Sequence, residues 1–294
     1  MRRILPPLFA LLCCAAVAAP VPEAERPFRP APLTVTENRV PLRVNPANGM
    51  QLLDATLNGV PCTLLLDTGA SHTTFDLAFL KTKLPDLPLK PIELGGTTNV
   101  DGAPKAFPVF SLKLGSAELT KFVGMALPLD HLSEAVGERV DGILGMNTMA
   151  YAPFRLSLRD ASVTWYPTMP EVPGAVTVPV LQGTGDNAFH VIASRGGEGK
   201  TFPALIDSGA SMTFMDDRLW PAAGEAAAIS AAGVNEVMAL NVKRGEPGEL
   251  ALGAFRLPIR PLLSHGEMPL LGADSLRGAD LYFDVDARVL RMAK

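Results

Sequence analysis

The sequence has 294 residues, of which 48% are hydrophobic and 19% charged, and its formal net charge is −4. This composition excludes a disordered chain, and an acidic balance without any basic cluster argues against nucleic-acid binding. Proline and glycine are abundant (27 and 26 residues), which favours short strands and turns over long helices.

The chain begins with a predicted signal peptide, residues 1–18. An arginine pair precedes an apolar run from Ile4 to Val17, and small residues close that run. The run is too short to span a bilayer well, so a membrane anchor is the weaker alternative. Cys13 and Cys14 leave a lipoprotein as a further alternative, disfavoured because neither follows a small residue. We therefore expect an exported protein, periplasmic or secreted.

Proline-rich stretches divide the remainder into two units. Residues 19–39 are expected to form an extended tether or a short pro-segment. Residues 40–167 form the first unit, residues 168–175 a linker, and residues 176–294 the second unit. Only one cysteine, Cys62, remains after the signal peptide, so no intramolecular disulfide is expected. A thiol nucleophile is possible there in principle, but the strand-like surroundings favour a buried small residue.

In the first unit, the pattern predicts short elements bounded by turn residues. The expected elements are hairpin strands over 40–66 with Asn-Gly turns at 48–49 and 58–59, a short helix over 76–84, a glycine-rich hairpin from 92, a short helix over 129–137, and a closing strand over 154–166.

The second unit repeats this order with one addition. The expected elements are strands around 178–181 and 189–193, a strand over 202–206, an alanine-rich helix over 222–232, a hairpin-like turn at 244–248, and a closing strand pair over 281–292.

One motif occurs in both units. Residues 65–71 read Leu-Leu-Asp-Thr-Gly-Ala-Ser, and residues 205–211 read Leu-Ile-Asp-Ser-Gly-Ala-Ser. Each copy is followed by an apolar-apolar-glycine segment, which ends at Gly145 and at Gly272. Landmarks repeated in the same order indicate a duplicated unit, which is the covalent equivalent of a symmetric dimer.

The repeated acids, Asp67 and Asp207, suggest a chemistry. Two carboxyl groups held close in a low-dielectric site cannot both ionise, so their protons dissociate in two separate steps. One group can then act as a base toward water while the other donates a proton to a carbonyl oxygen. A single Asp-Thr-Gly could be an ordinary turn, but two copies with matching flanks make that interpretation weak.

At these motifs the chain resembles the aspartic proteases, and the retropepsin-like members in particular. The resemblance implies an all-β, bilobal fold of two pseudo-two-fold-related retropepsin-like β-barrel lobes with few short helices. It implies that Asp67 and Asp207 are catalytic and that residues 143–145 and 270–272 pass behind their loops. The loop residues implied to support the acids are Thr68, Gly69, Ala70, Ser208, Gly209 and Ala210. The implied flap and substrate-binding residues are Gly95, Gly96 and Gly102, with residues 243–248 as a smaller counterpart.

The chain departs from the pepsin-like branch of that family. Ala70 and Ala210 stand where pepsin-like enzymes usually carry a hydroxyl group, and neither flap region contains a tyrosine. Loss of a hydroxyl donor to a carboxylate raises the pKa of that carboxyl group. We therefore expect an optimum at weakly acidic to near-neutral pH.

The function predicted from the sequence is an aspartic endopeptidase that needs no cofactor, acts on a peptide or protein in the inter-lobe cleft, and works as a monomer. No metal site is expected, because the four histidines show no ligand spacing. Two alternatives stay open. The chain could be a non-catalytic peptide-binding or scaffold protein that keeps the fold, or each lobe could pair with its counterpart in a second chain.

Overall fold

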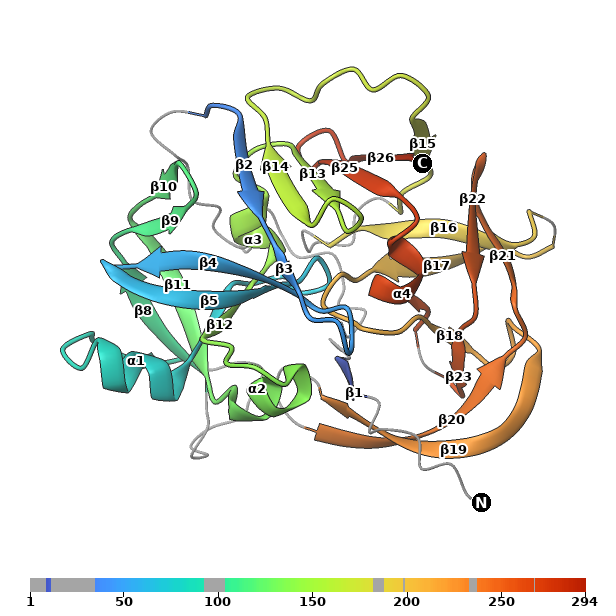
Figure 1. The fold of residues 1–294 in the computed structure, drawn as a ribbon, viewed down its shortest axis with the longest axis horizontal. Helices are drawn as coiled ribbons and strands as arrows, with labels where there is room; N and C mark the ends of the chain where they lie inside the picture. Colours follow the sequence, from blue (N-terminus) through green and yellow to red (C-terminus); the bar gives the residue numbers. More distant parts are fainter. Residues whose placement is uncertain are drawn as a thin grey trace.

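A computed structural model describes residues 9–11, 35–92, 104–181, 188–197, 199–232, 237–266 and 268–294. Over these residues the protein is mostly β-structure with a few short helices, which confirms the predicted all-β class (Figure 1). Most of the predicted signal peptide, most of the tether, and the three predicted flap glycines lie outside the described residues. Within the described part of the chain, no helix is long and apolar enough to cross a membrane.

The first of three sheets, the N-terminal sheet, grows from a tight hairpin. Leu57 pairs with Val60 across the two-residue loop Asn58-Gly59, whose φ angles are 46° and 85°. Positive φ at both loop residues is typical of the turn that matches strand twist, and Asn-Gly is its preferred sequence. The predicted turn is therefore confirmed.

The N-terminal sheet has ten strands, and β3 (Arg43–Val44) pairs with β4 off the main path. The order of the others is β10 (Ala117–Leu119), β9 (Leu112–Leu114), β4 (Gln51–Leu57), β5 (Val60–Leu66), β12 (Gly142–Leu144), β6 (Thr74–Asp76), β11 (Phe122–Leu127), β8 (Lys105–Val109) and β7 (Lys90–Pro91).

The C-terminal sheet also has ten strands. Their order is β1 (Phe9–Leu11), β19 (Ala222–Ala232), β20 (Val237–Gly245), β23 (Leu262–Ser264), β18 (Phe214–Asp216), β24 (Leu270–Leu271), β17 (Phe202–Ile206), β16 (His190–Arg195), β21 (Gly248–Leu252) and β22 (Phe255–Ile259). Part of this sheet repeats part of the N-terminal sheet, with the same strand order and the same parallel or antiparallel pairings. The repeated path is β17-β24-β18-β23-β20-β19 here and β5-β12-β6-β11-β8-β7 in the N-terminal sheet.

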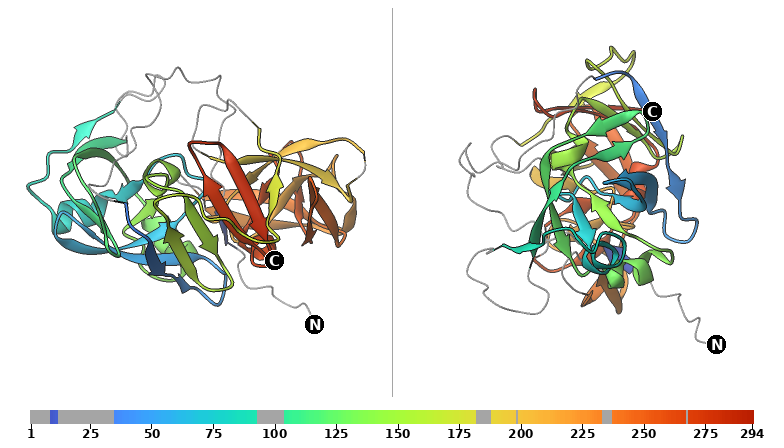
Figure 2. Two further views of the ribbon diagram at one scale, coloured as in Figure 1. Left: turned by 90° about the horizontal axis from the view of Figure 1, so that it is seen from above. Right: turned by 90° about the vertical axis from the view of Figure 1, so that its left-hand side faces the viewer.

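A six-stranded sheet joins the two halves of the chain. Its order is β15 (Val176–Val178), β26 (Val289–Ala293), β25 (Asp280–Asp284), β13 (Phe154–Ser157), β14 (Ser162–Trp165) and β2 (Asn38–Pro41). The single closing strand predicted over 154–166 is in fact a strand pair, β13 and β14, whereas the pair predicted over 281–292 is confirmed as β25 and β26. The two pairs lie side by side in one shared sheet because β13 pairs with β25. Figures 1 and 2 show these strands between the blue-to-green and the orange-to-red parts of the chain.

The helices are α1 (Leu77–Lys83), α2 (Asp130–Val136), α3 (Met146–Met149) and α4 (Ala273–Leu276). The first two were predicted. Asp76 caps α1 by accepting a hydrogen bond of 2.8 Å from the Phe79 backbone N–H, and Gly137 ends α2 with a φ of 80°. A carboxylate at the N-cap and a glycine beyond the last turn are the usual boundary signals of a helix.

The predicted helix over residues 222–232 is wrong, because this segment is strand β19. Alanine has the highest helix propensity, but propensity is a weak signal that pairing with a partner strand overrides. Here β20 supplies that partner, since Ala226–Ala232 pair antiparallel with Val237–Lys243. The register continues to Ala222 opposite Gly245 after an irregularity, so the whole segment belongs to one long hairpin.

The expected second flap, residues 243–248, is also misplaced. These residues connect β20 to β21, which pair with different neighbours and do not form a hairpin with each other. The matching strand orders make the β19–β20 hairpin the counterpart of β7–β8. The glycine and proline residues at 244–248 favour a turn locally. Whether the strands on either side of that turn pair with each other is decided by the rest of the sheet.

The core extends from both large sheets into the six-stranded sheet. Phe154 of β13 stacks on Phe283 of β25 with ring centroids 4.6 Å apart, and Phe189 meets Phe283 edge to face at 5.2 Å. All three rings are fully buried. These contacts hold segments from the middle of the sequence against the C-terminal strands, because aromatic pairs add to the free energy gained by burial.

Candidate active site

The first acid, Asp67, lies at the end of β5 in a closed loop. Its side chain is 0% exposed, and its Oδ1 atom accepts hydrogen bonds from the N–H groups of Gly69 (2.8 Å) and Ala70 (2.9 Å). Its own N–H donates to the carbonyl oxygen of Leu144 in β12 (3.1 Å). The loop therefore folds back on its carboxylate, and β12 anchors it from the next strand.

The second acid, Asp207, repeats this arrangement at the end of β17. Its side chain is 1% exposed, and Oδ1 accepts from the N–H groups of Gly209 (2.9 Å) and Ala210 (3.0 Å). Its N–H donates to the carbonyl oxygen of Leu271 in β24 (3.0 Å). Both sequence-predicted acids thus sit in equivalent loops backed by the predicted apolar-apolar-glycine segments.

The structure brings the two loops together through a reciprocal set of hydrogen bonds. The Thr68 N–H donates to Ser208 Oγ, and the Ser208 N–H donates to Thr68 Oγ1, both at 3.0 Å. Each hydroxyl then donates to a carbonyl oxygen of the opposite strand, Ile206 at 2.8 Å and Leu66 at 3.0 Å. All four groups are buried, so each polar atom of this junction is satisfied by the other half of the chain.

Each acid lies against the glycine of the opposite loop. A Cβ atom built on Gly69 would lie 2.6 Å from Asp207 Cγ, and one built on Gly209 would lie closer still to Asp67 Cγ. Real Cβ atoms essentially never come so close to another carbon. Glycine is required at both positions because it lets the backbone approach the neighbouring carboxyl group.

The pKa of Asp207 is raised well above its ordinary value. Burial is the main cause, and the neighbouring Asp67 adds to it through its charge and a hydrogen bond between the side chains. The N–H groups that donate to Asp207 Oδ1 act in the opposite direction. The arrangement favours a pair that holds one proton between two carboxyl groups.

Two threonines that the sequence analysis missed brace the loops from behind. Thr73 Oγ1 accepts from the Gly145 N–H (3.0 Å), and Thr213 Oγ1 accepts from the Gly272 N–H (3.1 Å). Each also meets a hydroxyl of the following short helix at 2.7 Å, Thr148 in one half and Ser275 in the other. Both threonines follow their acid by the same number of residues. This repeated threonine is the sequence signal from which both residues could have been identified.

Cys62, the other possible nucleophile in the sequence, does not belong to this site. Burial raises the pKa of the Cys62 thiol to about 12, with a smaller contribution from the Asp141 carboxylate. A thiol with that pKa is neither a nucleophile nor a metal ligand near neutral pH. The structure describes Cys62 as a buried core residue of β5, as the sequence analysis favoured.

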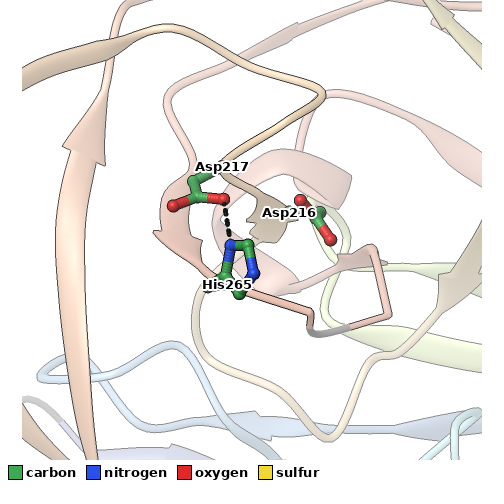
Figure 3. Close-up of side chains that lie close together, drawn as sticks. All are labelled: Asp216, Asp217 and His265. Carbon is green, nitrogen blue, oxygen red and sulfur yellow. Dashed lines mark hydrogen bonds and ion pairs between the residues drawn. The ribbon is translucent and has the colours of Figure 1, made fainter.

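One group of possible metal ligands occurs elsewhere. Asp216, Asp217 and His265 place ligand atoms within 4.8 Å of one another (Figure 3). Asp216 is already paired with the Arg218 guanidinium through both of its oxygens, which lowers its pKa, and Asp217 meets His265 Nδ1 at 2.9 Å. Local ion pairs account for these side chains.

The comparisons with known proteins bear on the first half of the chain. A family model described as "Aspartyl protease" matches residues 53–148, which contain Asp67, its loop and the β12 segment behind it. No curated protein matches the chain. The matched region is therefore similar to the aspartyl protease family, and this similarity supports a hydrolase of the protease type.

Proposed function

We propose that the protein is an aspartic endopeptidase in which Asp67 and Asp207 form the catalytic pair. The observation that carries the proposal is the reciprocal junction, because it holds two buried carboxyl groups from distant segments side by side. The similarity of residues 53–148 to aspartyl proteases supports the same reaction class.

In the proposed mechanism a water molecule lies between the two carboxyl groups. The ionised carboxylate takes a proton from this water, whose oxygen bonds to the scissile carbonyl carbon, while the protonated carboxyl donates to the carbonyl oxygen. The resulting gem-diol collapses when the amide nitrogen accepts a proton and the C–N bond breaks. The products are a carboxylic acid and an amine, and no cofactor takes part.

The proposed pH range is weakly acidic to near neutral. The pair is active while it holds one proton, and it loses activity when both groups ionise at higher pH or both protonate at lower pH. The raised pKa of Asp207 supports retention of that proton into the near-neutral range. Ala70 and Ala210 donate to the acids only through their backbone N–H groups, so no hydroxyl at these positions lowers the pKa further.

The proposed architecture has two lobes related by a pseudo-two-fold axis, residues 40–167 and 176–294, with a linker at 168–175. The shared strand order of the two large sheets supports it. A peptide or protein substrate would lie extended across both loops as an added strand. The glycines Gly95, Gly96 and Gly102 would belong to a flap over it. One chain supplies both acids, which supports action as a monomer.

We further propose that the protein is exported to the periplasm or secreted after removal of residues 1–18. The basic, apolar and small-residue regions of that segment support export. The proline-rich residues 19–39 would then tether or precede the folded part. Edman sequencing or mass spectrometry of the mature protein checks this directly, since an N-terminus at Met1 on the exported protein would contradict it.

The test of the catalytic pair is a peptide-library digest between pH 3 and pH 8. Asp67→Asn and Asp207→Asn should each lower cleavage by about a thousandfold, the range expected when a general acid or base is lost. Asp54→Asn is the matched control, because the Asp54 side chain is 78% exposed on β4. Equal cleavage by the wild type and both active-site variants would contradict the proposal.

Two further outcomes separate the alternatives. If mixing the two inactive variants restored cleavage, the acids would pair between chains. If the wild type bound peptides without cleaving any of them, the chain would be a non-catalytic peptide-binding protein.

A further inference from the structure

The two acid loops carry different side chains at one equivalent position. His72 and Met212 follow their acids by the same number of residues. A Cβ atom on Gly145 would lie 2.5 Å from the His72 carbonyl carbon, and one on Gly272 would lie 2.5 Å from that of Met212. The backbones therefore take the same course past equivalent glycines. The side chain at this position is an imidazole in the Asp67 loop and a thioether in the Asp207 loop.

Met212 belongs to a half-exposed apolar surface beside Asp207. It packs on the buried cluster that contains Ala210 and Phe214. The half-buried apolar side chains that pack on this same cluster are Met212, Ile229, Leu240 and Met268. Ile229 and Leu240 face each other across the β19–β20 hairpin, so the hairpin and the acid loop pack on the same buried cluster. We call these four side chains the apolar wall.

His72 gives the other loop a polar character. Its Nδ1 atom lies 2.8 Å from Ser71 Oγ, and both side chains are half-exposed. Burial lowers the pKa of His72, which favours the neutral form of the ring. A neutral imidazole paired with a hydroxyl offers hydrogen bonds to a ligand and carries no charge.

Among the described residues, the hydrophobic cluster under the Asp67 loop has buried members only, whereas the apolar wall is half-exposed. Its described members, which include Ala70, Leu127 and Met50, are all buried. Helix α2 contributes Leu132 and Val136 to this cluster and so covers it. The half-exposed side chains beside the two acids therefore differ in kind: polar next to Asp67 and apolar next to Asp207.

From this difference we infer that the site selects substrate side chains asymmetrically. A bulky apolar residue, such as Leu, Met or Phe, lies on the apolar wall, and a polar uncharged residue, such as Gln, Asn or Ser, lies at His72. The inference rests on the proposed function, because a substrate must lie across both loops to meet both side chains. Met212 and His72 are then specificity-determining residues on opposite sides of the cleaved bond.

The experiment is a peptide-library digest read by mass spectrometry, with the full chain and two variants. The wild type should enrich apolar residues on one side of the cleaved bond and polar ones on the other. Met212→Gln should lower the apolar preference by about tenfold, the scale on which hydrophobic pockets discriminate. His72→Leu should turn the polar side apolar and leave the other side unchanged.

His265→Met serves as the control, because this histidine is 74% exposed and pairs with Asp217 away from both loops. Its profile should match the wild type. The inference is overturned if both main variants keep the wild-type profile, if both alter the same side, or if the control shifts the profile as strongly as they do.

A binding measurement separates this inference from the proposed function. A fluorescent peptide with Leu, and its Gln analogue, are titrated against Asp207→Asn with and without Met212→Gln. The Leu peptide should bind about tenfold more weakly after Met212→Gln, with little change for the Gln peptide. Cleavage with unaltered preference would keep the proposed function and overturn the inference. Selective binding without cleavage by any chain would keep the inference and overturn the function.

Discussion

The Asp67 loop and the Asp207 loop share their backbone hydrogen bonds and differ in the side chains around them. In both, two N–H groups fold onto the carboxylate, the next strand accepts the acid's N–H, and a threonine braces the glycine behind. The two loops differ at the residue after the acid, Thr68 or Ser208, and at the equivalent positions His72 and Met212. The acids are therefore positioned by the backbone loops and by the Thr68 and Ser208 hydroxyls, while positions 72 and 212 differ between the halves.

The largest effect on activity is expected when the space beside each acid is filled. Gly69→Ala and Gly209→Ala should each reduce peptide cleavage by at least about a hundredfold, since displacing a reacting group by about 1 Å costs that much. The added methyl group would overlap the opposite carboxyl group in both cases. Steady-state kinetics on one peptide checks the prediction. Gly278→Ala is the control that should keep cleavage nearly intact, because an added Cβ there would meet no atom within 4 Å and its φ is not positive.

A second test breaks the junction from either side. Thr68→Val and Ser208→Ala each remove a buried hydroxyl and leave an N–H and a carbonyl oxygen of the other half unpaired. Each should lower the free energy of unfolding by about 2 kcal/mol, the usual cost of a buried unsatisfied group. Urea denaturation measures this. The double variant should lose less than the sum, because each hydroxyl bonds the backbone N–H of the other residue and both changes loosen the same junction. Strict additivity would contradict this coupling.

A third test uses a position where the halves differ. Asn147 is buried and accepts a hydrogen bond of 2.7 Å from the Thr73 N–H, whereas its counterpart Asp274 is exposed and accepts from Thr213 Oγ1. Asn147→Asp should lower the free energy of unfolding by about 1–3 kcal/mol at pH 7.5, because it buries an acidic group. Asp274→Asn should change it by less than about 0.5 kcal/mol. Equal effects would show that the two positions have the same environment.

The loss for Asn147→Asp should also depend on pH in a defined direction. A buried carboxyl group keeps its proton more tightly when folded, so the folded state binds more protons than the unfolded state. Stability should then fall as pH rises above the unfolded value near 4. Denaturation at pH 4 should consequently show a smaller loss than denaturation at pH 7.5.

The smallest effect is expected at Cys62, which precedes Asp67 by as many residues as Phe202 precedes Asp207. Both side chains are buried. With a pKa of about 12, the thiol should stay unmodified by a thiol reagent at pH 8 until the protein unfolds. The rate of modification should follow urea unfolding, and fast labelling of the native protein would contradict the buried environment.

Local signals in the sequence predicted those parts of the fold that local chemistry determines. The Asn58-Gly59 turn, the Asp76 cap and the Gly137 helix end each depend on a few neighbouring residues. The alanine-rich segment was misassigned because its structure depends on β20, a partner that no local pattern reveals. The shared sheet was missed for the same reason, since β13 finds β25 far along the chain.

The sequence located the two acid loops, because a motif that appears twice marks equivalent positions in both halves. The catalytic role of these residues stays a prediction. Thr73 and Thr213 were overlooked although they repeat as well, since a threonine in a strand has many ordinary explanations. The difference between His72 and Met212 could be read from the sequence, but its surroundings could not.

The pairing of β13 with β25 also determines when the six-stranded sheet can be completed during synthesis. Arg155 of β13 donates a hydrogen bond of 2.7 Å to Asp280, a residue 125 positions later in the chain. At ribosomal rates of about 5–20 residues per second, β13 waits for roughly 6–25 s before its partner exists. During that interval the nascent chain presents an unpaired strand edge to its surroundings. The first half of this protein therefore leaves the ribosome before the strands that complete its sheet have been translated.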